Sequence, residues 1–262
     1  MSDFELRFGG IRRLYGADGL ARLSRAHVCV VGIGGVGSWA VEALARTGVG
    51  RLTLIDLDDV CVSNVNRQLH ALDGEIGRPK VEVMARRAHA INPACEIHAV
   101  TEFFTQEKVA GLFAGSFDSV IDAIDDVGNK CLLIAECHGR GIPIITCGGA
   151  GGRRDPTAVR VADIAQATHD RLLRQTRDRL RAENGFPRKP GKKFGVECVF
   201  SPEPPVFPRK DGSVCATREE GNEMKLDCES GYGTASFVTG TFGFAAAARV
   251  VAMLTSTSAK HS

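Results

Sequence analysis

The chain has 262 residues, a formal net charge of +2, and is 44% hydrophobic and 24% charged. This length and composition exclude a disordered chain and a small fold stapled by disulfides, because enough apolar surface is available for a full core. No two of its nine cysteines are separated by only two residues, which excludes a zinc site built from CxxC pairs. The cysteines in apolar runs suit buried free thiols, and the acidic N-terminus does not form a signal peptide, so we expect a cytoplasmic protein.

The first 150 residues alternate predicted strands and helices. Such alternation, with helices of about 10–15 residues, predicts βαβ units around a mainly parallel sheet. We therefore predict an α/β fold with a Rossmann-like, mainly parallel twisted sheet and helices on both faces. The predicted strands span 27–33, 51–56, 96–100, 119–123 and 142–147, and the predicted helices span 36–47, 80–92 and 129–139.

The pattern changes after residue 152, so we divide the chain into a Rossmann-like domain, 1–152, and a C-terminal extension, 153–262, that continues the same fold. The extension contains a predicted strand (158–162), a predicted helix (168–184) and two short apolar runs (196–200 and 206–208).

The chain ends in a long run of small and apolar residues, 231–254. Eighteen uncharged residues precede Arg249, which is close to the length of a membrane span. The run also contains four glycines, three threonines and a serine. We therefore favour a core helix packed against the sheet over membrane association through 231–254.

A glycine-rich turn between a predicted strand and a predicted helix is the most informative local feature. Gly32, Gly34 and Gly37 form a GxGxxG pattern that also contains Gly35. Backbone amides there can approach a phosphate closely, and the helix start adds positive potential. Asp56 ends the next strand, where a carboxylate would accept hydrogen bonds from a ribose hydroxyl. These residues predict a nucleotide site, and they describe an NAD-binding domain equally well.

The polar segment after Asp56 favours ATP over a dinucleotide. Arg67 can hold a phosphate through two donors, and Lys80 supplies a point charge. Asp125 ends a strand, where it would hold Mg²⁺. Each has a structural alternative: surface charges for the cations, loop caps for Asp56 and Asp58, and a helix N-cap for Asp125. We predict an ATP site formed by Gly32, Gly34, Gly35, Gly37, Asp56, Asp58, Asn64, Asn66, Arg67, Lys80 and Asp125, with Arg67, Lys80 and Asp125 as the catalytic residues.

The motif order GxGGxG, LIDLDDVxxSNxNRQ, IGRPKVE and DAID resembles the ubiquitin-activating-enzyme-like family of adenylyltransferases. The resemblance implies phosphate ligands at Arg67 and Lys80, a magnesium-associated carboxylate at Asp125, and a homodimer. Family members that adenylate carrier proteins also carry zinc-binding CxxC pairs, which this chain lacks. Their N-terminal arginine, which reaches a partner subunit's ATP site, is replaced by Gly10, so Arg12 or Arg13 is the candidate substitute.

Four further motifs extend the resemblance to one branch of this family: RFGGIRRLYG, GGAGGRRDPTAV, GVECVFSPE and LDCESGYGTASFVTGTFGF. That branch dehydrates N6-threonylcarbamoyladenosine at position 37 of tRNA. The implied reaction uses ATP to activate the carboxylate of the modified base, which then cyclises and expels AMP. Two alternatives stay open: an adenylyltransferase acting on the C-terminal glycine of a sulfur-carrier protein, and a non-catalytic scaffold.

Residues 171–193 hold nine Lys or Arg against two acids, a local net charge of +7. This segment is either a solvated surface or a tRNA-binding surface. Cys228 is either a structural thiol, which we favour, or a sulfur acceptor, which would require a cysteine desulfurase as partner. The candidate tRNA contacts are Arg174, Arg177 and Arg181 on one helix face, followed by Lys189, Lys192 and Lys193.

Overall fold

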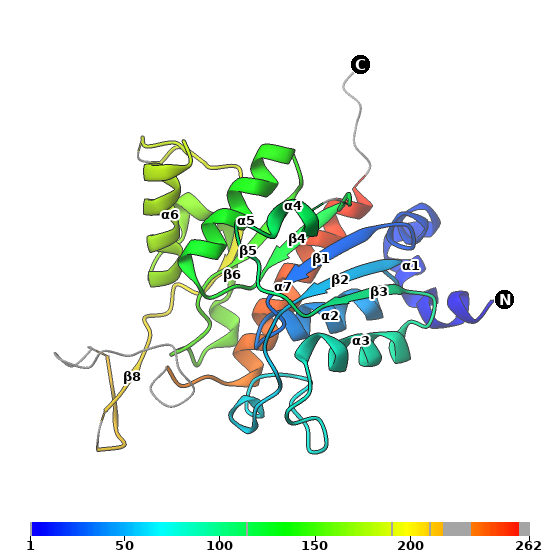
Figure 1. Cartoon of the computed structure of the whole chain (residues 1–262), viewed down its shortest axis with the longest axis horizontal. Coiled ribbons are helices and arrows are strands. Elements are labelled where there is room, and N and C mark those ends of the chain that lie inside the picture. The colour runs from blue at the N-terminus through cyan, green and yellow to red at the C-terminus, as the bar shows by residue number, and fades with distance from the viewer. Residues whose placement is uncertain (1, 114, 190, 210, 217–231, 257–262) are drawn as a thin grey trace.

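A computed structural model describes residues 2–113, 115–189, 191–209, 211–216 and 232–256 (Figure 1). Its centre is a seven-stranded sheet with strand order β3-β2-β1-β4-β5-β7-β6. All neighbouring pairs are parallel except β6 with β7, which confirms the predicted Rossmann-like fold. The strands are β1 (His27–Val31), β2 (Arg51–Ile55), β3 (Glu96–Val100), β4 (Ser119–Asp122), β5 (Ile144–Cys147), β6 (Arg160–Asp163) and β7 (Glu197–Phe200).

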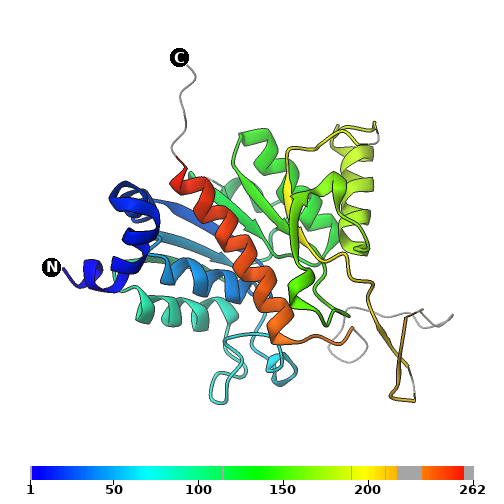
Figure 2. The same cartoon turned by 180° about the vertical axis from the view of Figure 1, so that it is seen from behind.

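Helices cover both faces of the sheet because successive strand residues point to opposite sides. In β1, Val28 and Val30 join the core with α1, α2, α3 and α7, whereas Cys29 and Val31 join the core with α4, α5 and α6. Figure 2 shows α7 crossing the first of these faces diagonally. The helices are α1 (Asp3–Leu23), α2 (Gly37–Arg46), α3 (Lys80–Ile91), α4 (Val109–Leu112), α5 (Val127–Arg140), α6 (Arg171–Glu183) and α7 (Ser236–Thr255).

Short elements complete the described chain. A two-stranded hairpin projects from the body near α7, and three 3-10 turns lie in connecting loops (Figure 1). The hairpin strands are β8 (Phe207–Pro208) and β9 (Val214–Cys215), and the turns are η1 (Val62–Asn64), η2 (Pro156–Ala158) and η3 (Ile164–Gln166).

The predicted core helix at the end of the chain is α7. An added Cβ at Gly243 would lie 2.5 Å from the carbonyl oxygen of Val36 and 2.8 Å from the amide of Ala40, so glycine permits close packing on α2. Phe242 and Val250 are fully buried. Within the described part of the chain, α7 is the helix long and apolar enough to cross a membrane, and half of its apolar window is buried in the protein. The small and apolar residues of α7 therefore form part of the hydrophobic core of this fold.

Helix α1 is an element that the sequence pattern did not predict. Ser2 and Glu5 form a capping box at its start, and Gly16 kinks it with a φ of 77°. Four glycines and an irregular spacing of apolar residues weaken its helical signal. At its end, Arg22 donates to the carbonyl oxygens of Leu254 at 3.2 Å and Thr255 at 2.5 Å, which joins α1 to the end of α7.

The parallel strands end at one edge of the sheet, and the loops that follow them meet there (Figure 1). Helix α1 leads into the start of β1 and therefore lies at the opposite edge. In open α/β sheets, ligands bind at the carboxyl ends of the strands. The loops after β1, β2, β4 and β5 are therefore the place to examine for a site.

Candidate functional site: a nucleotide-binding edge

The loop after β1 is shaped to let its backbone approach a phosphate. Gly32 has a φ of 88°, and an added Cβ would lie 2.8 Å from the carbonyl oxygen of Ala123. An added Cβ at Gly37 would overlap the carbonyl oxygen of Gly32, whereas Gly34 faces only the Gln68 amide nitrogen at 3.8 Å. No side chain caps the start of α2. The structure therefore presents an open glycine loop at an uncapped helix N-terminus, which suits an anion.

Asp56 both braces this loop and offers acceptors to a ligand. One carboxylate oxygen accepts from the amide of Ile33 at 2.6 Å, and the other accepts from the amide of Asp58 at 2.8 Å. These two bonds show that Asp56 caps the loop, which was the structural alternative for this residue. Burial raises the pKa of Asp56, and nearby Lys80 opposes that shift. Each oxygen keeps acceptor capacity, so the same side chain can also bind a ribose hydroxyl.

Lys80 is a buried cation at the start of α3. Its side chain is 7% exposed, and its Nζ lies 2.6 Å from an oxygen of Asp58. The backbone amide of Lys80 also donates to the carbonyl oxygen of Asp58, at 3.0 Å. Burial, together with the charge of Lys80, lowers the pKa of His70 to about 4, so this imidazole is neutral at pH 7. Lys80 is therefore held in place, and Asp58 is its partner in the described structure.

The polar loop before Arg67 is organised by its own side chains. Asn64 is buried and accepts from the amide of Cys61 at 3.1 Å, which fixes the η1 turn. Arg67 donates from Nη1 to the carbonyl oxygen of Ser63 at 2.6 Å and to Oδ1 of Asn66 at 3.0 Å. These bonds orient the guanidinium of Arg67 while leaving its Nε and Nη2 donors without a bond among the described residues.

Helices α2 and α7 hold this loop from the other side. Trp39 Nε1 and Thr239 Oγ1 donate to the carbonyl oxygen of Arg67 at 3.1 and 3.2 Å. Asn66 Nδ2 donates to the carbonyl oxygen of Thr234 at 2.9 Å. The sequence analysis did not identify Trp39, Thr234 or Thr239, because nothing in a local pattern shows which backbone carbonyl they will meet.

Asp122 is the last residue of β4, and Asp125 and Asp126 follow it, so Asp125 does not end the strand as predicted. The partners of the three aspartates separate their roles. Asp126 accepts from the amide of Asn129 at 2.8 Å and is the N-cap of α5. The alternative that Asp125 is this N-cap is therefore wrong. Asp122 is fully buried and paired with Lys130. Asp125 is exposed, and its carboxylate has no hydrogen bond to any residue that the structure describes.

A single exposed carboxylate fits magnesium that arrives with ATP. Mg²⁺ at nucleotide sites is commonly held by one or two carboxylates plus the substrate's phosphates. Within the described residues, no group of three or more histidine, cysteine, aspartate or glutamate side chains forms a metal cage. Asp125 and the glycine loop follow adjacent strands, because β1 pairs with β4.

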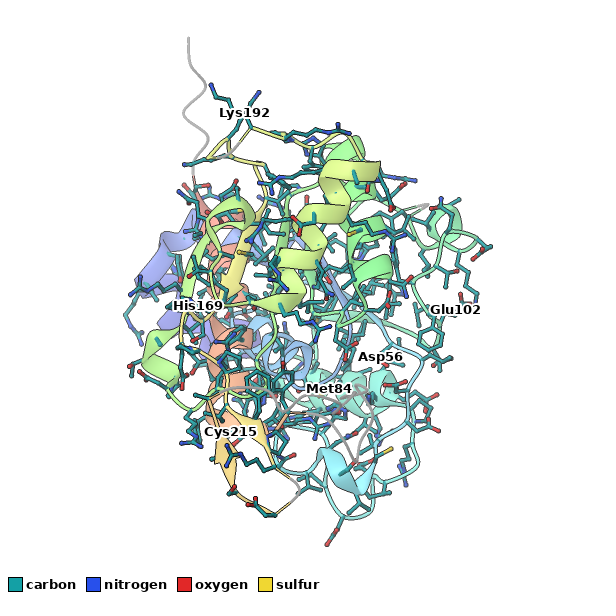
Figure 3. All side chains as sticks on the ribbon, turned by 90° about the vertical axis from the view of Figure 1, so that its left-hand side faces the viewer. Asp56, Met84, Glu102, His169, Lys192 and Cys215 are labelled. Atoms are coloured by element: carbon teal, nitrogen blue, oxygen red, sulfur yellow. The ribbon has the colours of Figure 1, made fainter. Side chains whose placement is uncertain are left out.

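The predicted basic segment leads away from the level of Asp56. Lys192 lies at the top of the view in Figure 3, whereas His169, just before α6, lies much closer to the height of Asp56. Arg177 donates to the carbonyl oxygens of Ile164 and Ala167 at 3.0 and 2.6 Å.

Arg181 also has a local structural role. It donates to the carbonyl oxygen of Pro187 at 3.3 Å and lies over the ring of Phe194. Arg174 is exposed, as are Lys189, Lys192 and Lys193, whereas Cys228 lies outside the described residues.

The comparisons with known proteins agree with this geometry. Residues 10–262 match the model of the ThiF family. The chain belongs to the ThiF family. A relative from Escherichia coli strain K12, named tRNA threonylcarbamoyladenosine dehydratase, is 49% identical over 256 residues, which are 97% of this chain and 96% of the relative.

Two further comparisons differ in how much of the chain they cover. The structure of the E. coli tRNA N6-threonylcarbamoyladenosine dehydratase in complex with ATP has a TM-score of 0.88 and 45% identity, covering 100% of this chain and 99% of that chain. The molybdopterin-synthase adenylyltransferase of Salmonella typhimurium is 38% identical over 136 residues, only 52% of this chain and 54% of that relative. The family predicted from the sequence motifs is confirmed.

Proposed function

We propose that this chain uses ATP to dehydrate N6-threonylcarbamoyladenosine at position 37 of tRNA to its cyclic form. The observation that carries the proposal is the extent of the likeness. The E. coli dehydratase matches through the C-terminal extension as well as the nucleotide half, whereas the molybdopterin-synthase adenylyltransferase of S. typhimurium matches over about half of the chain. The sequence-based prediction named the same reaction, and the relatives' names agree with it.

The site supplies what adenylation requires. The substrate carboxylate attacks the α-phosphorus of ATP, and pyrophosphate leaves. Charge that develops on the phosphate oxygens would be met by Arg67, by Lys80 and by the amides of the glycine loop. A nucleophilic group of the same substrate side chain then attacks the activated carbonyl carbon and expels AMP. The net change is loss of one water from the nucleoside, and the intramolecular attack gains from high effective concentration.

Asp125 is the residue that we assign to magnesium. Its carboxylate is exposed beside the glycine loop, while the flanking Asp122 and Asp126 are occupied by structural partners. The bound ion would neutralise charge on the phosphates. Asp58 is the counter-ion from which an incoming triphosphate would draw Lys80.

A homodimer would cover an exposed apolar surface. Val62 is 70% exposed on the nucleotide loop, and Phe237 and Phe244 are 58% and 47% exposed on α7. Because α7 runs from the nucleotide edge to α1, a two-fold axis near its middle would bring α1 of one protomer to the partner's nucleotide edge (Figure 2). Arg12 or Arg13, both exposed on α1, would then complete the partner's ATP site.

The tRNA would approach the start of α6. An open pocket of about 490 Å³ there is lined by His169, Arg171 and Arg174 among other residues. Asp170 connects this helix start to the end of β5 by accepting from the amide of Gly149 at 2.9 Å. Arginines at this edge would bind backbone phosphates beside the target base. The proposed location is the cytoplasm, and sulfur transfer to Cys228 from a desulfurase is not needed by the reaction.

The test is ATP turnover by the purified chain with tRNA that carries N6-threonylcarbamoyladenosine, followed by mass analysis of the nucleosides. We expect one AMP released for each nucleoside that loses one water. Binding of ATP without any change in the tRNA would reject the proposal. A search for a carrier protein that ends in Gly-Gly would then follow.

A further inference from the structure

A fully buried ion pair lies next to the turn that leads from β4 to Asp125. Lys130, in the first turn of α5, places Nζ 2.8 Å from Oδ2 of Asp122, and both side chains are 0% exposed. Thr146, in β5, donates to the same oxygen at 2.5 Å and lies 3.2 Å from the Lys130 ammonium. Helix α5 and strands β4 and β5 therefore meet in one polar cluster inside the apolar core.

The second oxygen of Asp122 controls the backbone of the turn. Its Oδ1 accepts from the amide of Ile124 at 3.0 Å, so the carboxylate fixes the backbone immediately after β4. The amide of Ala123 donates to the carbonyl oxygen of Val31 at 2.9 Å, and the position of a Cβ on Gly32 falls 2.8 Å from the Ala123 carbonyl oxygen. The turn thus lies in contact with the glycine loop on one side and leads to Asp125 on the other.

We infer that Asp122 is a positioning residue for the adenylation step, and that Lys130 is the counter-ion of its buried carboxylate. The side-chain oxygen of Asp122 fixes the turn at Ile124, and the turn sets where Asp125 stands relative to the glycine loop. This inference rests on the proposed function, in which Asp125 meets the magnesium of bound ATP.

Stability alone does not account for this cluster. Taking two charges out of water is unfavourable, and apolar side chains of similar volume often give equal or higher stability than a buried ion pair. Apolar side chains at these two positions would remove the oxygen that accepts from the amide of Ile124. A pair of double variants can therefore separate the contribution of the charges from that of the turn.

Asp122→Asn/Lys130→Met removes both charges and keeps an oxygen that can accept from Ile124. Asp122→Leu/Lys130→Met removes both charges and that acceptor. The measurement is the affinity of the full chain for ATP by calorimetry, once with Mg²⁺ and once with EDTA, together with the thermal unfolding midpoint. We expect the Asn variant to keep the wild-type ratio of the two affinities within about twofold, because the turn survives.

We expect the Leu variant to unfold near the Asn variant's midpoint but to bind ATP almost equally with Mg²⁺ and with EDTA, and to form AMP at least about tenfold more slowly. An Asn-like affinity ratio in the Leu variant would overturn the inference. If the Leu variant does not fold, Asp122→Ala/Lys130→Met makes the same comparison without added bulk. Because the affinity ratio is measured without tRNA, it decides the inference even if the proposed dehydration fails.

Discussion

Replacing Lys80 by methionine tests the proposed electrostatics of adenylation directly. The change removes the ammonium but keeps the length of the buried stem and the backbone bond to Asp58. A unit charge about 4 Å from another contributes about 4 kcal/mol at an effective dielectric constant of 20. Asp58 competes for the same ammonium at 2.6 Å, although its own side chain is 58% exposed. We therefore expect a loss of about 2.7 kcal/mol in the transition state, or roughly 10²-fold in rate.

The assay is single-turnover formation of AMP with saturating ATP and the modified tRNA, so that chemistry is separated from product release. Arg51→Met is the control, because Arg51 forms a surface ion pair with Glu96 at the amino-terminal end of β2, opposite the site. The control should react at the wild-type rate. A Lys80→Met enzyme that forms AMP within about threefold of wild type would remove Lys80 from the mechanism and refute this electrostatic argument.

Four further outcomes are expected. Asp125→Asn should raise the Mg²⁺ concentration needed for half-maximal AMP formation, measured by magnesium titration. Arg177→Met should lower the free energy of unfolding in urea by about 1–3 kcal/mol, because two carbonyl groups lose their donor, whereas Arg174→Met should have little effect. As the pH falls from 6 to 4, His70 is protonated in the unfolded chain but stays neutral in the folded one. The free energy of unfolding should therefore decrease by about 1.4 kcal/mol per pH unit more than it does in His70→Gln. Phe244→Glu should shift the chain toward monomer in sedimentation.

The order of strands and helices in the nucleotide half was predictable because its signals are local. Apolar runs such as the one ending at Val31 are bounded by glycine turns, and Gly32 needs the positive φ that the motif implies. The insertion of β7 between β5 and β6 was not predictable in this way. It depends on pairing between residues about 50 positions apart in sequence, such as Ile145 and Glu197, which no local pattern reports.

The same limit applies to the site. The predicted helix at Lys80 is confirmed as α3, but only the fold shows that Asp126 caps α5 and leaves Asp125 exposed beyond the end of β4. Lys130 was missed although a signal existed. It shares a helix face with Ile134 and Cys137, which are both buried, so a lysine there requires an anionic partner inside the core.

The packing of α7 has a consequence for the order in which this protein can mature. Thr234 and Thr239 hold the backbone and side chains of the Arg67 loop, and α7 covers the face of α2 next to the glycine turn. During translation, the ribosome releases these residues long after the βαβ half. The phosphate-binding residues are therefore synthesised before α7 can hold them in place. A product that stops short of α7 should neither bind ATP nor escape quality control.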